Sequence, residues 1–294
     1  MKIDKIRLPD NGYIFNGKNL HGKFGNILYV IENLFILAKN TKSKSILRNS
    51  KHKYDNLLVT YPLVIDFTSP ENNNCSRVIN DKKLFIFKHY YEDKLFIDKE
   101  NEGIKYVNSL LKKDYNKFNV EDNDLVINIR GGRDIFRKPR EKINRMYTQP
   151  PLSYYMDIIE NNNYGNIIIT TDSTKYNPVI KHLSSVYNAI VIDSDFYDQV
   201  SLILRAKNLI TTRSTFSLYL ARVSENLKRA YVWIDNTIEW NDFTPKPNNS
   251  LSNNISVINY SCNDYIKSGE WIASEEQIKL MMSLPINALY KEKI

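Results

Sequence analysis

Short apolar runs alternate with longer amphipathic stretches in the second half of the chain. The runs are rich in Ile and Val, whereas the stretches carry apolar residues three and four positions apart, as helices do. Apolar strands that alternate with helices indicate an α/β fold whose parallel sheet is covered on both faces. The expected strands are 125–130, 166–171, 189–193, 208–212 and 230–234, and the expected helices are 152–160, 175–187, 199–206 and 215–224.

The first 120 residues are less regular. Helical spacing of apolar residues predicts helices over 26–39 and 101–111, and strands are expected at 57–67 and 84–87. Because the pattern of apolar and polar residues changes near residue 120, we expect two domains. These are an N-terminal domain, residues 1–120, and a C-terminal domain, residues 121–294.

A final helix is expected after Ser274. Ser274 and Gln277 have the spacing of a capping box, and Pro285 would stop the helix that they begin. This last helix is a candidate to pack back on the N-terminal domain.

The composition is that of a globular protein of 294 residues, with 42% hydrophobic side chains and a formal net charge of +8. The positive charge is scattered except at residues 42–53, so we interpret it as a solvated surface that names no partner. Two cysteines without a CxxC pair argue against a disulfide framework and a structural zinc site. No signal peptide is evident and residues 27–38 are too short for a membrane span, so we expect a cytoplasmic protein.

The segment HGKFGN at residues 21–26 comes directly before the first expected helix. Gly22 and Gly25 allow the backbone to approach a ligand closely, and a helix N-terminus offers free N–H donors. It is not a phosphate-binding loop of the Walker A type, because no GK[ST] follows. Taken alone, the segment is better explained as a glycine turn that caps a helix.

The segment VINIRGGRDIF at residues 126–136 ends a buried strand with Arg130, which Gly131 and Gly132 follow. A guanidinium matches a diphosphate through two N–H groups, and the glycines would let phosphate oxygens approach the backbone. A turn with solvent-facing arginines is an equal alternative.

Two further strand ends carry polar side chains. In TTRSTFSLYLA, residues 211–221, Ser214 or Thr215 is a good helix N-cap, and with Phe216 the same turn could bind a phosphate through hydroxyls, N–H groups and the helix dipole. Asp172 ends another strand, where it could meet a ribose or a base. A simple Asx turn at Asp172 is equally expected.

Taken in order, these segments resemble the fucosyltransferase superfamily of nucleotide-sugar glycosyltransferases. That family carries a PxGRFGNxLFQ-type segment, then a strand ending in HxRxGD, then an STFS segment between a strand and a helix. Here GKFGNILYVIENLFILA, INIRGGRDIF followed by QPPLSYYMDII, IIITTDS and DQVSLILRAKNLITTRSTFSLYLA run colinearly from Gly22 to Ala221. Two departures stand out: Asn128 replaces the motif's His, and an extra residue separates Gly132 from Asp134.

The resemblance implies a GT-B-like fold, in which two Rossmann-like domains face a cleft. Residues 1–120 would be the domain on the acceptor side, and residues 121–294 the domain that binds the nucleotide sugar. It implies an inverting, metal-independent fucosyltransferase that uses GDP-fucose as its donor, holds no cofactor, and modifies a hydroxyl of a glycan or a protein. It also implies that Arg130 contacts the donor diphosphate and is central to transfer, and that Asn26 orients the acceptor or the donor from the N-terminal domain. The Asp of the family motif is not carried over.

The sequence leaves other interpretations open. One is a glycosyltransferase of the same fold with another nucleotide sugar, and another is a non-catalytic relative, since Asn128 and the insertion would suit a retired site. A nucleic-acid-binding protein is less favoured, because no recognition module is evident. Asp193 and Asp195 form only a weak metal pattern, so no metal site is expected. Glu32 is expected to face solvent, and the sequence names neither the acceptor nor the oligomeric state.

Overall fold

The computed structural model describes nine stretches of the chain, and its Cα positions divide into two compact units. The first unit is Met1–Lys113 with Asn241–Pro245, and the second is Asp114–Trp240 with Lys246–Ile294. The division therefore comes at Lys113, where the sequence placed a boundary at residue 120. The described residues are 24–40, 44–47, 63–66, 100–111, 118–136, 147–193, 196–212, 214–234 and 255–293.

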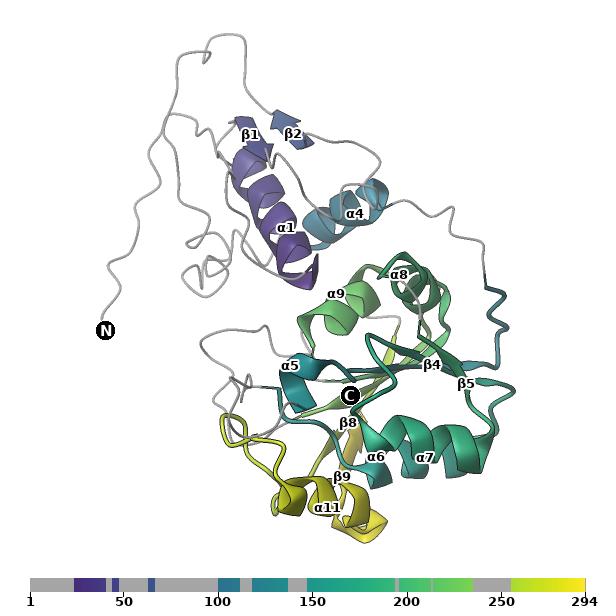
Figure 1. Cartoon of the computed structure of the whole chain (residues 1–294). Coiled ribbons are helices and arrows are strands. Elements are labelled where there is room, and N and C mark those ends of the chain that lie inside the picture. Colours follow the sequence, from purple (N-terminus) through teal and green to yellow (C-terminus); the bar gives the residue numbers. More distant parts are fainter. Residues whose placement is uncertain are drawn as a thin grey trace. The chain divides into compact units, whose positions relative to one another are not determined.

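The first unit contains two helices that pack together, α1 (Phe24–Asn40) and α4 (Glu100–Leu110), and an antiparallel pair of strands, β1 (Lys44–Leu47) and β2 (Leu63–Asp66) (Figure 1). The helices meet through apolar side chains and through the rings of Phe35 and Tyr106, whose centroids lie 4.2 Å apart. Both expected helices are thus confirmed. The strand expected at 84–87 lies outside the described residues, as do residues 57–62 and 67 of the strand expected at 57–67.

Two expectations about α1 were wrong. The helix begins at Phe24, so Gly25 lies inside its first turn instead of in a turn before it. Glu32 is buried rather than facing solvent, with only 1% of its surface exposed. The cause is the close crossing of α4, since a Cβ on Gly103 would lie 2.7 Å from the Cγ of Glu32. A larger residue at position 103 would push the helices apart.

The second unit is built on a sheet of seven strands, in the order β5-β4-β3-β6-β7-β8-β9. All neighbours are parallel except the last pair, in which β9 runs antiparallel to β8. This unit is a mixed α/β structure of the doubly wound kind. The strands are β3 (Leu125–Ile129), β4 (Ile167–Thr171), β5 (Ile190–Ile192), β6 (Asn208–Thr211), β7 (Arg229–Trp233), β8 (Ser256–Ser261) and β9 (Tyr290–Lys293).

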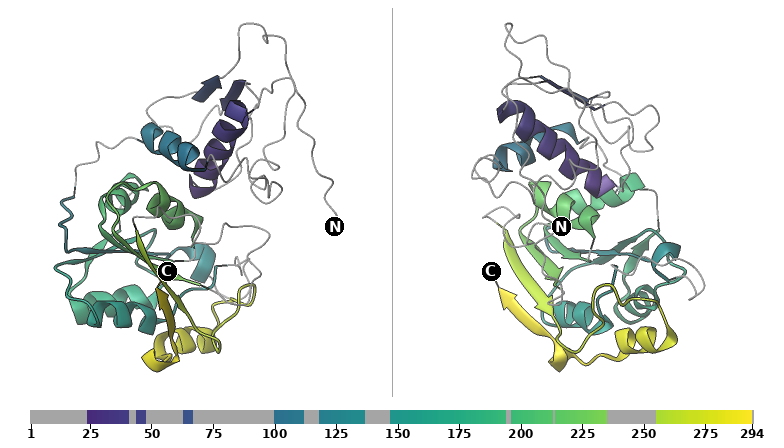
Figure 2. Two further views of the ribbon diagram at one scale, coloured as in Figure 1. Left: turned by 180° about the vertical axis from the view of Figure 1, so that it is seen from behind. Right: turned by 90° about the vertical axis from the view of Figure 1, so that its left-hand side faces the viewer.

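Helices cover both faces of this sheet. Helices α6 (Leu152–Glu160) and α7 (Pro178–Tyr187) lie on one face, and α8 (Phe196–Arg205) and α9 (Thr215–Val223) lie on the other (Figures 1 and 2). The short helix α5 (Arg133–Phe136) follows β3 directly, and a 3-10 turn, Ile286–Ala288, precedes β9. The apolar strands are therefore buried on both sides, as their sequence predicted.

The last helix, α11 (Glu275–Ser283), packs against α6 within the second unit. Its Met281 is fully buried in the same core as Trp271, whose indole N–H donates to the carbonyl of Ile135 at 2.8 Å. The expected contact of this helix with the N-terminal domain stays a prediction. Ser274 caps the helix by accepting from the N–H of Gln277, as the capping box predicted.

The strand order creates a point where the direction of winding reverses. The chain runs outward from β3 through β4 to β5, then returns to the other side of β3 to form β6. The carboxyl ends of β3 and β6 consequently lie next to each other with their connections leading to opposite faces. Open α/β sheets bind ligands at this position.

The five strands expected in the second half of the chain are confirmed to within two residues at each end. Strands β8 and β9 were missed, and α7 begins at Pro178 instead of 175 because Asn177 caps it. No helix among the described stretches is both long enough and apolar enough to cross a membrane.

Asp124, just before β3, provides a test of the fold, and Asp122 provides its control. Buried Asp124 accepts from the N–H groups of Glu121 and Asn166, each at 2.8 Å. Asp124→Ala leaves both donors unpaired, so we expect the free energy of unfolding, measured in urea, to fall by about 2–4 kcal/mol. Asp122 is exposed and pairs with Lys207 at the surface, so Asp122→Ala should leave the unfolding midpoint unchanged. Equal losses in both variants would contradict the role given to Asp124.

Candidate functional site

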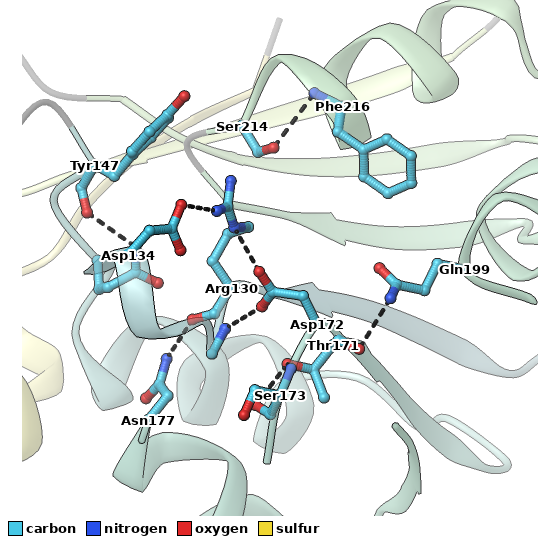
Figure 3. Close-up of polar contacts among 12 residues, drawn as sticks. Arg130, Asp134, Tyr147, Thr171, Asp172, Ser173, Asn177, Gln199, Ser214 and Phe216 are labelled. Carbon is cyan, nitrogen blue, oxygen red and sulfur yellow. Dashed lines mark hydrogen bonds and ion pairs between the residues drawn. The ribbon is translucent and has the colours of Figure 1, made fainter. Parts of the chain in front are cut away.

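Arg130 lies at the carboxyl end of β3 and is held between two carboxylates (Figure 3). Its Nη2 donates to Oδ2 of Asp134 at 2.7 Å, and its Nε forms an ion pair with Oδ2 of Asp172 at 3.2 Å. The guanidinium also lies over the ring of Tyr147, 5.2 Å from the ring centroid. Arg130 is only 8% exposed, so burial and three partners together fix the direction of its side chain.

The backbone at Arg130 is tied to two neighbouring segments. The N–H of Gly131 donates to Oδ1 of Asp172 at 2.7 Å, which joins the end of β3 to the end of β4. The side-chain amide of Asn177 donates to the carbonyl of Arg130 at 3.0 Å, and its Oδ1 accepts from the N–H of Val179 at 3.0 Å. The residue that caps α7 therefore also fixes the backbone of Arg130.

The glycines after Arg130 are required by packing against the segment after β4. A Cβ on Gly131 would lie 1.9 Å from the carbonyl oxygen of Ser173. A Cβ on Gly132 would lie 2.6 Å from Oδ2 of Asp172 and 2.7 Å from Oδ1 of Asp134. The sequence interpretation gave these glycines to an approaching phosphate, whereas here they admit a backbone carbonyl and two carboxylates.

Asp172 does not form the Asx turn that was one of its two expected roles. Its carboxylate bonds to Arg130 and Gly131, and the local turn is made instead by Thr171, whose Oγ1 accepts from the N–H of Ser173 at 3.2 Å. The carbonyl of Thr171 accepts from the side chain of Gln199 at 3.0 Å, which anchors this segment to α8 (Figure 3). Asp172 is therefore placed by its neighbours on both sides.

Ser214 caps α9 and accepts from the N–H of Phe216 at 3.3 Å, so the N-cap interpretation is confirmed. Phe216 is mostly buried, with its ring centroid 4.8 Å from that of Phe196. Because α9 follows β6, the positive end of its dipole lies at the carboxyl edge of the strand next to β3. Arg130 and the start of α9 thus border the same reversal point.

Asn128 and Thr170 pair in register on β3 and β4, and each lies two residues before Arg130 or Asp172, on the same side of the sheet. Both are buried, and in the described part of the chain Oδ1 of Asn128 and Oγ1 of Thr170 have no hydrogen-bond partner. A buried polar atom without a partner costs about 1–3 kcal/mol. Among the described residues, Asn128 therefore offers a buried acceptor without a partner two residues before Arg130.

The remaining expected site residues are described by their own elements. Gly25 and Asn26 lie in α1 of the first unit, and the side chain of Asn26 is outside the described part of the structure. Their approach to a donor stays a prediction. Thr215 is the first residue of α9 and is half-buried, and Arg133 begins α5 and is exposed. Within the described stretches, no three His, Cys, Asp or Glu side chains gather as a metal site.

Sequence reasoning missed three partners of Arg130, namely Asp134, Tyr147 and Asn177. Asp134 was set aside because the insertion disturbs the motif, yet the glycine turn and the short helix α5 bring its carboxylate back to Arg130. Asn177 precedes a proline, which is a recognisable signal for a capped helix start. Tyr147 gave no local signal, since its position depends on how the chain returns after α5.

We expect replacement by alanine to destabilise the protein more at Gly131 than at Gly132. Gly131→Ala places a methyl group against a backbone carbonyl that cannot move alone, so we expect a loss of about 3 kcal/mol or more in unfolding free energy. Gly132→Ala meets the ends of two carboxylate side chains, of which Asp134 can rotate away and Asp172 has to shift only at one oxygen, so its loss should be clearly smaller. Urea unfolding followed by circular dichroism measures both. A larger loss for Gly132→Ala would show that the turn is packed differently.

Comparisons with known proteins give little beyond this geometry. No protein-family model matches the chain, and no curated protein matches it. A crystal structure of POFUT1 in complex with GDP is similar to this structure with 11% sequence identity and a TM-score of 0.39, over 77% of this chain and 99% of that chain. Since likeness at this level does not establish a shared function, the chain's own residues have to carry the functional conclusion.

Proposed function

We propose that the chain is a glycosyltransferase that binds a nucleoside-diphosphate sugar at the carboxyl edge of the sheet, between β3 and β6. The observation that carries the proposal is the buried, oriented guanidinium of Arg130 at the reversal point of a doubly wound sheet. The start of α9 on the neighbouring strand adds N–H donors and a positive dipole end. A diphosphate is the ligand class that suits both features.

Donor identity and architecture are the finer part of the proposal. The ordered motifs that resemble the fucosyltransferase superfamily support GDP-fucose as the donor, a GT-B-like pair of domains, and an inverting transfer without metal. In this proposal Arg130 and the turn Ser214–Thr215–Phe216 hold the diphosphate. Gly25 and Asn26 contribute from the N-terminal unit, where Asn26 orients the acceptor hydroxyl of a glycan or protein.

The chemistry follows from charge. When the sugar leaves, negative charge grows on the diphosphate, and a fixed guanidinium and helix dipole stabilise that charge more than the ground state. The acceptor hydroxyl has to be held behind the anomeric carbon, so that the new bond forms as the old one breaks. Arg130 does not need to be reoriented for this step, because its partners already fix it.

A non-catalytic relative that binds a nucleotide is the second candidate. Two observations favour it: Arg130 is paired with two carboxylates, and Asn128 replaces the family's His. Binding of a nucleoside diphosphate without turnover of any nucleotide sugar would select this candidate.

The central prediction concerns Arg130 and its neighbour Arg133. Arg130→Ala should lower turnover of the donor on the order of a hundredfold or more, as the loss of one preorganised donor does elsewhere. Arg130→Lys should restore little, since an ammonium lacks the planar fork. Release of the nucleotide from GDP-fucose and other nucleotide sugars measures the rate, and circular dichroism checks the fold. Exposed Arg133 provides the matched control: near-normal turnover in Arg130→Ala with collapse in Arg133→Ala would reassign the role.

Metal removal is a separate test. We expect GDP to bind with unchanged affinity in the presence of EDTA, because the proposed site uses only a guanidinium, hydroxyls and N–H groups. Calorimetry measures the affinity, and a rise in the unfolding temperature with GDP gives a second readout, since a ligand of the native state stabilises it. A strict requirement for a divalent cation would point to a different transferase mechanism.

A further inference from the structure

We propose that the two carboxylates on Arg130 have opposite roles toward the donor. Asp172 is a positioning residue that keeps the guanidinium oriented, whereas Asp134 occupies the nitrogen that the donor's diphosphate takes when it binds. The inference rests on the proposed function for the identity of the ligand. The part that concerns Asp172 stands on the geometry of the protein without ligand.

Asp172 is fixed from two directions. Its Oδ1 accepts the Gly131 N–H at 2.7 Å, while its Oδ2 lies 3.2 Å from Nε of Arg130. The preceding residue is anchored as well, since the carbonyl of Thr171 accepts from Gln199 on α8. For Asp172 to leave Arg130, it would have to break the hydrogen bond from the backbone N–H of Gly131, which joins the ends of β3 and β4. It therefore remains in place when a ligand arrives.

Asp134 reaches Arg130 from a different kind of position. It lies four residues later in the four-residue helix α5, and its carboxylate accepts from Nη2 at 2.7 Å. The side-chain exposures of Asp134 and Asp172 are similar, 43% and 36%, so exposure does not distinguish them. The difference lies in the bond of Asp172 to the neighbouring strand's backbone. Rotation of the Asp134 side chain would release Nη2 without disturbing the join between β3 and β4.

The shape of the guanidinium decides which nitrogen the ligand needs. A phosphate is bound most strongly when two parallel N–H groups meet two of its oxygens. Nε is buried beside Asp172, so the remaining pair is Nη1 and Nη2, and Nη2 carries Asp134 in the absence of ligand. The pair becomes complete for a diphosphate when Asp134 turns away. Tyr147, beneath the plane of the guanidinium, keeps that plane in position during the exchange.

The net charge of the cluster also favours the departure of Asp134 when a diphosphate binds. One guanidinium between two carboxylates leaves the cluster with a net charge of −1, which repels an approaching diphosphate. Departure of Asp134 removes the nearer repulsion and frees a donor in a single step. Gly132 permits this arrangement, because any Cβ there would meet oxygens of both carboxylates.

The test uses amide substitutions that keep shape and remove charge. Asp172→Asn can still accept from Gly131 but loses its ion pair with Arg130, so we expect GDP affinity to fall about tenfold or more. Asp134→Asn weakens the competitor for Nη2, so GDP affinity should rise about threefold. Asp122→Asn, at the opposite edge of the sheet, removes the same charge and should leave affinity unchanged. Calorimetry with EDTA present measures all three.

A change of the same sign for Asp134→Asn and Asp172→Asn would overturn the opposite roles. So would a rise for Asp122→Asn equal to that for Asp134→Asn, because the gain would then come from net charge alone. Inorganic pyrophosphate serves as a second probe and separates the diphosphate contact from recognition of the base. It should show the same order of affinities among the variants.

The side-chain Nε–H signal of Arg130 in nitrogen-15 NMR tests the positioning role without ligand. Because Nε lies in an ion pair with Asp172, we expect relaxation of this signal to report a rigid side chain in the unmodified chain and in Asp134→Asn, and a mobile one in Asp172→Asn. Arg130→Lys assigns the signal by removing it. If no diphosphate binds the unmodified chain, the proposed function fails while this result still decides the role of Asp172. Equal rigidity in both Asn variants would overturn that role.

Discussion

The bond from the Gly131 N–H to the carboxylate of Asp172 is the contact on which the rest of the site depends. It joins the ends of two neighbouring strands, and it is possible only because residue 131 has no Cβ to strike the carbonyl of Ser173. With the strand ends joined, the second oxygen of the same carboxylate meets Arg130. A cation held in this way loses little conformational freedom when an anion binds, so more of the contact energy remains as affinity.

The order of the strands determines which elements lie next to Arg130. Because the chain winds outward from β3 and returns to form β6 beside it, the strand that ends in Arg130 is next to the strand that leads into α9. A side-chain charge and a helix dipole from distant segments thus serve the same edge of the sheet. The opposite edge is closed by the side chain of Asp124, which binds the entries of β3 and β4.

Much of the second unit could be predicted from its sequence, because strands buried on both faces are apolar along their whole length. Strand β9 could not, since YKEK is exposed at every position and is a strand only through its pairing with β8. The burial of Glu32 depends on where α4 crosses, which no local pattern shows. In the site, Arg130 and Ser214 were found from strand ends and helix caps. The partners of Arg130 were missed or misread because they meet it only through the turns after β3 and β4.

Asn177 shows how a residue outside the binding edge becomes part of it. Its carbonyl oxygen caps α7 while its amide nitrogen supports the backbone of Arg130, so one short side chain supplies an acceptor in one direction and a donor in another. Aspartate would cap the helix as well but has no proton for the Arg130 carbonyl, and a serine hydroxyl has one oxygen for both directions. Among natural variants of this chain, position 177 is therefore expected to tolerate fewer residue types than helix capping alone would allow.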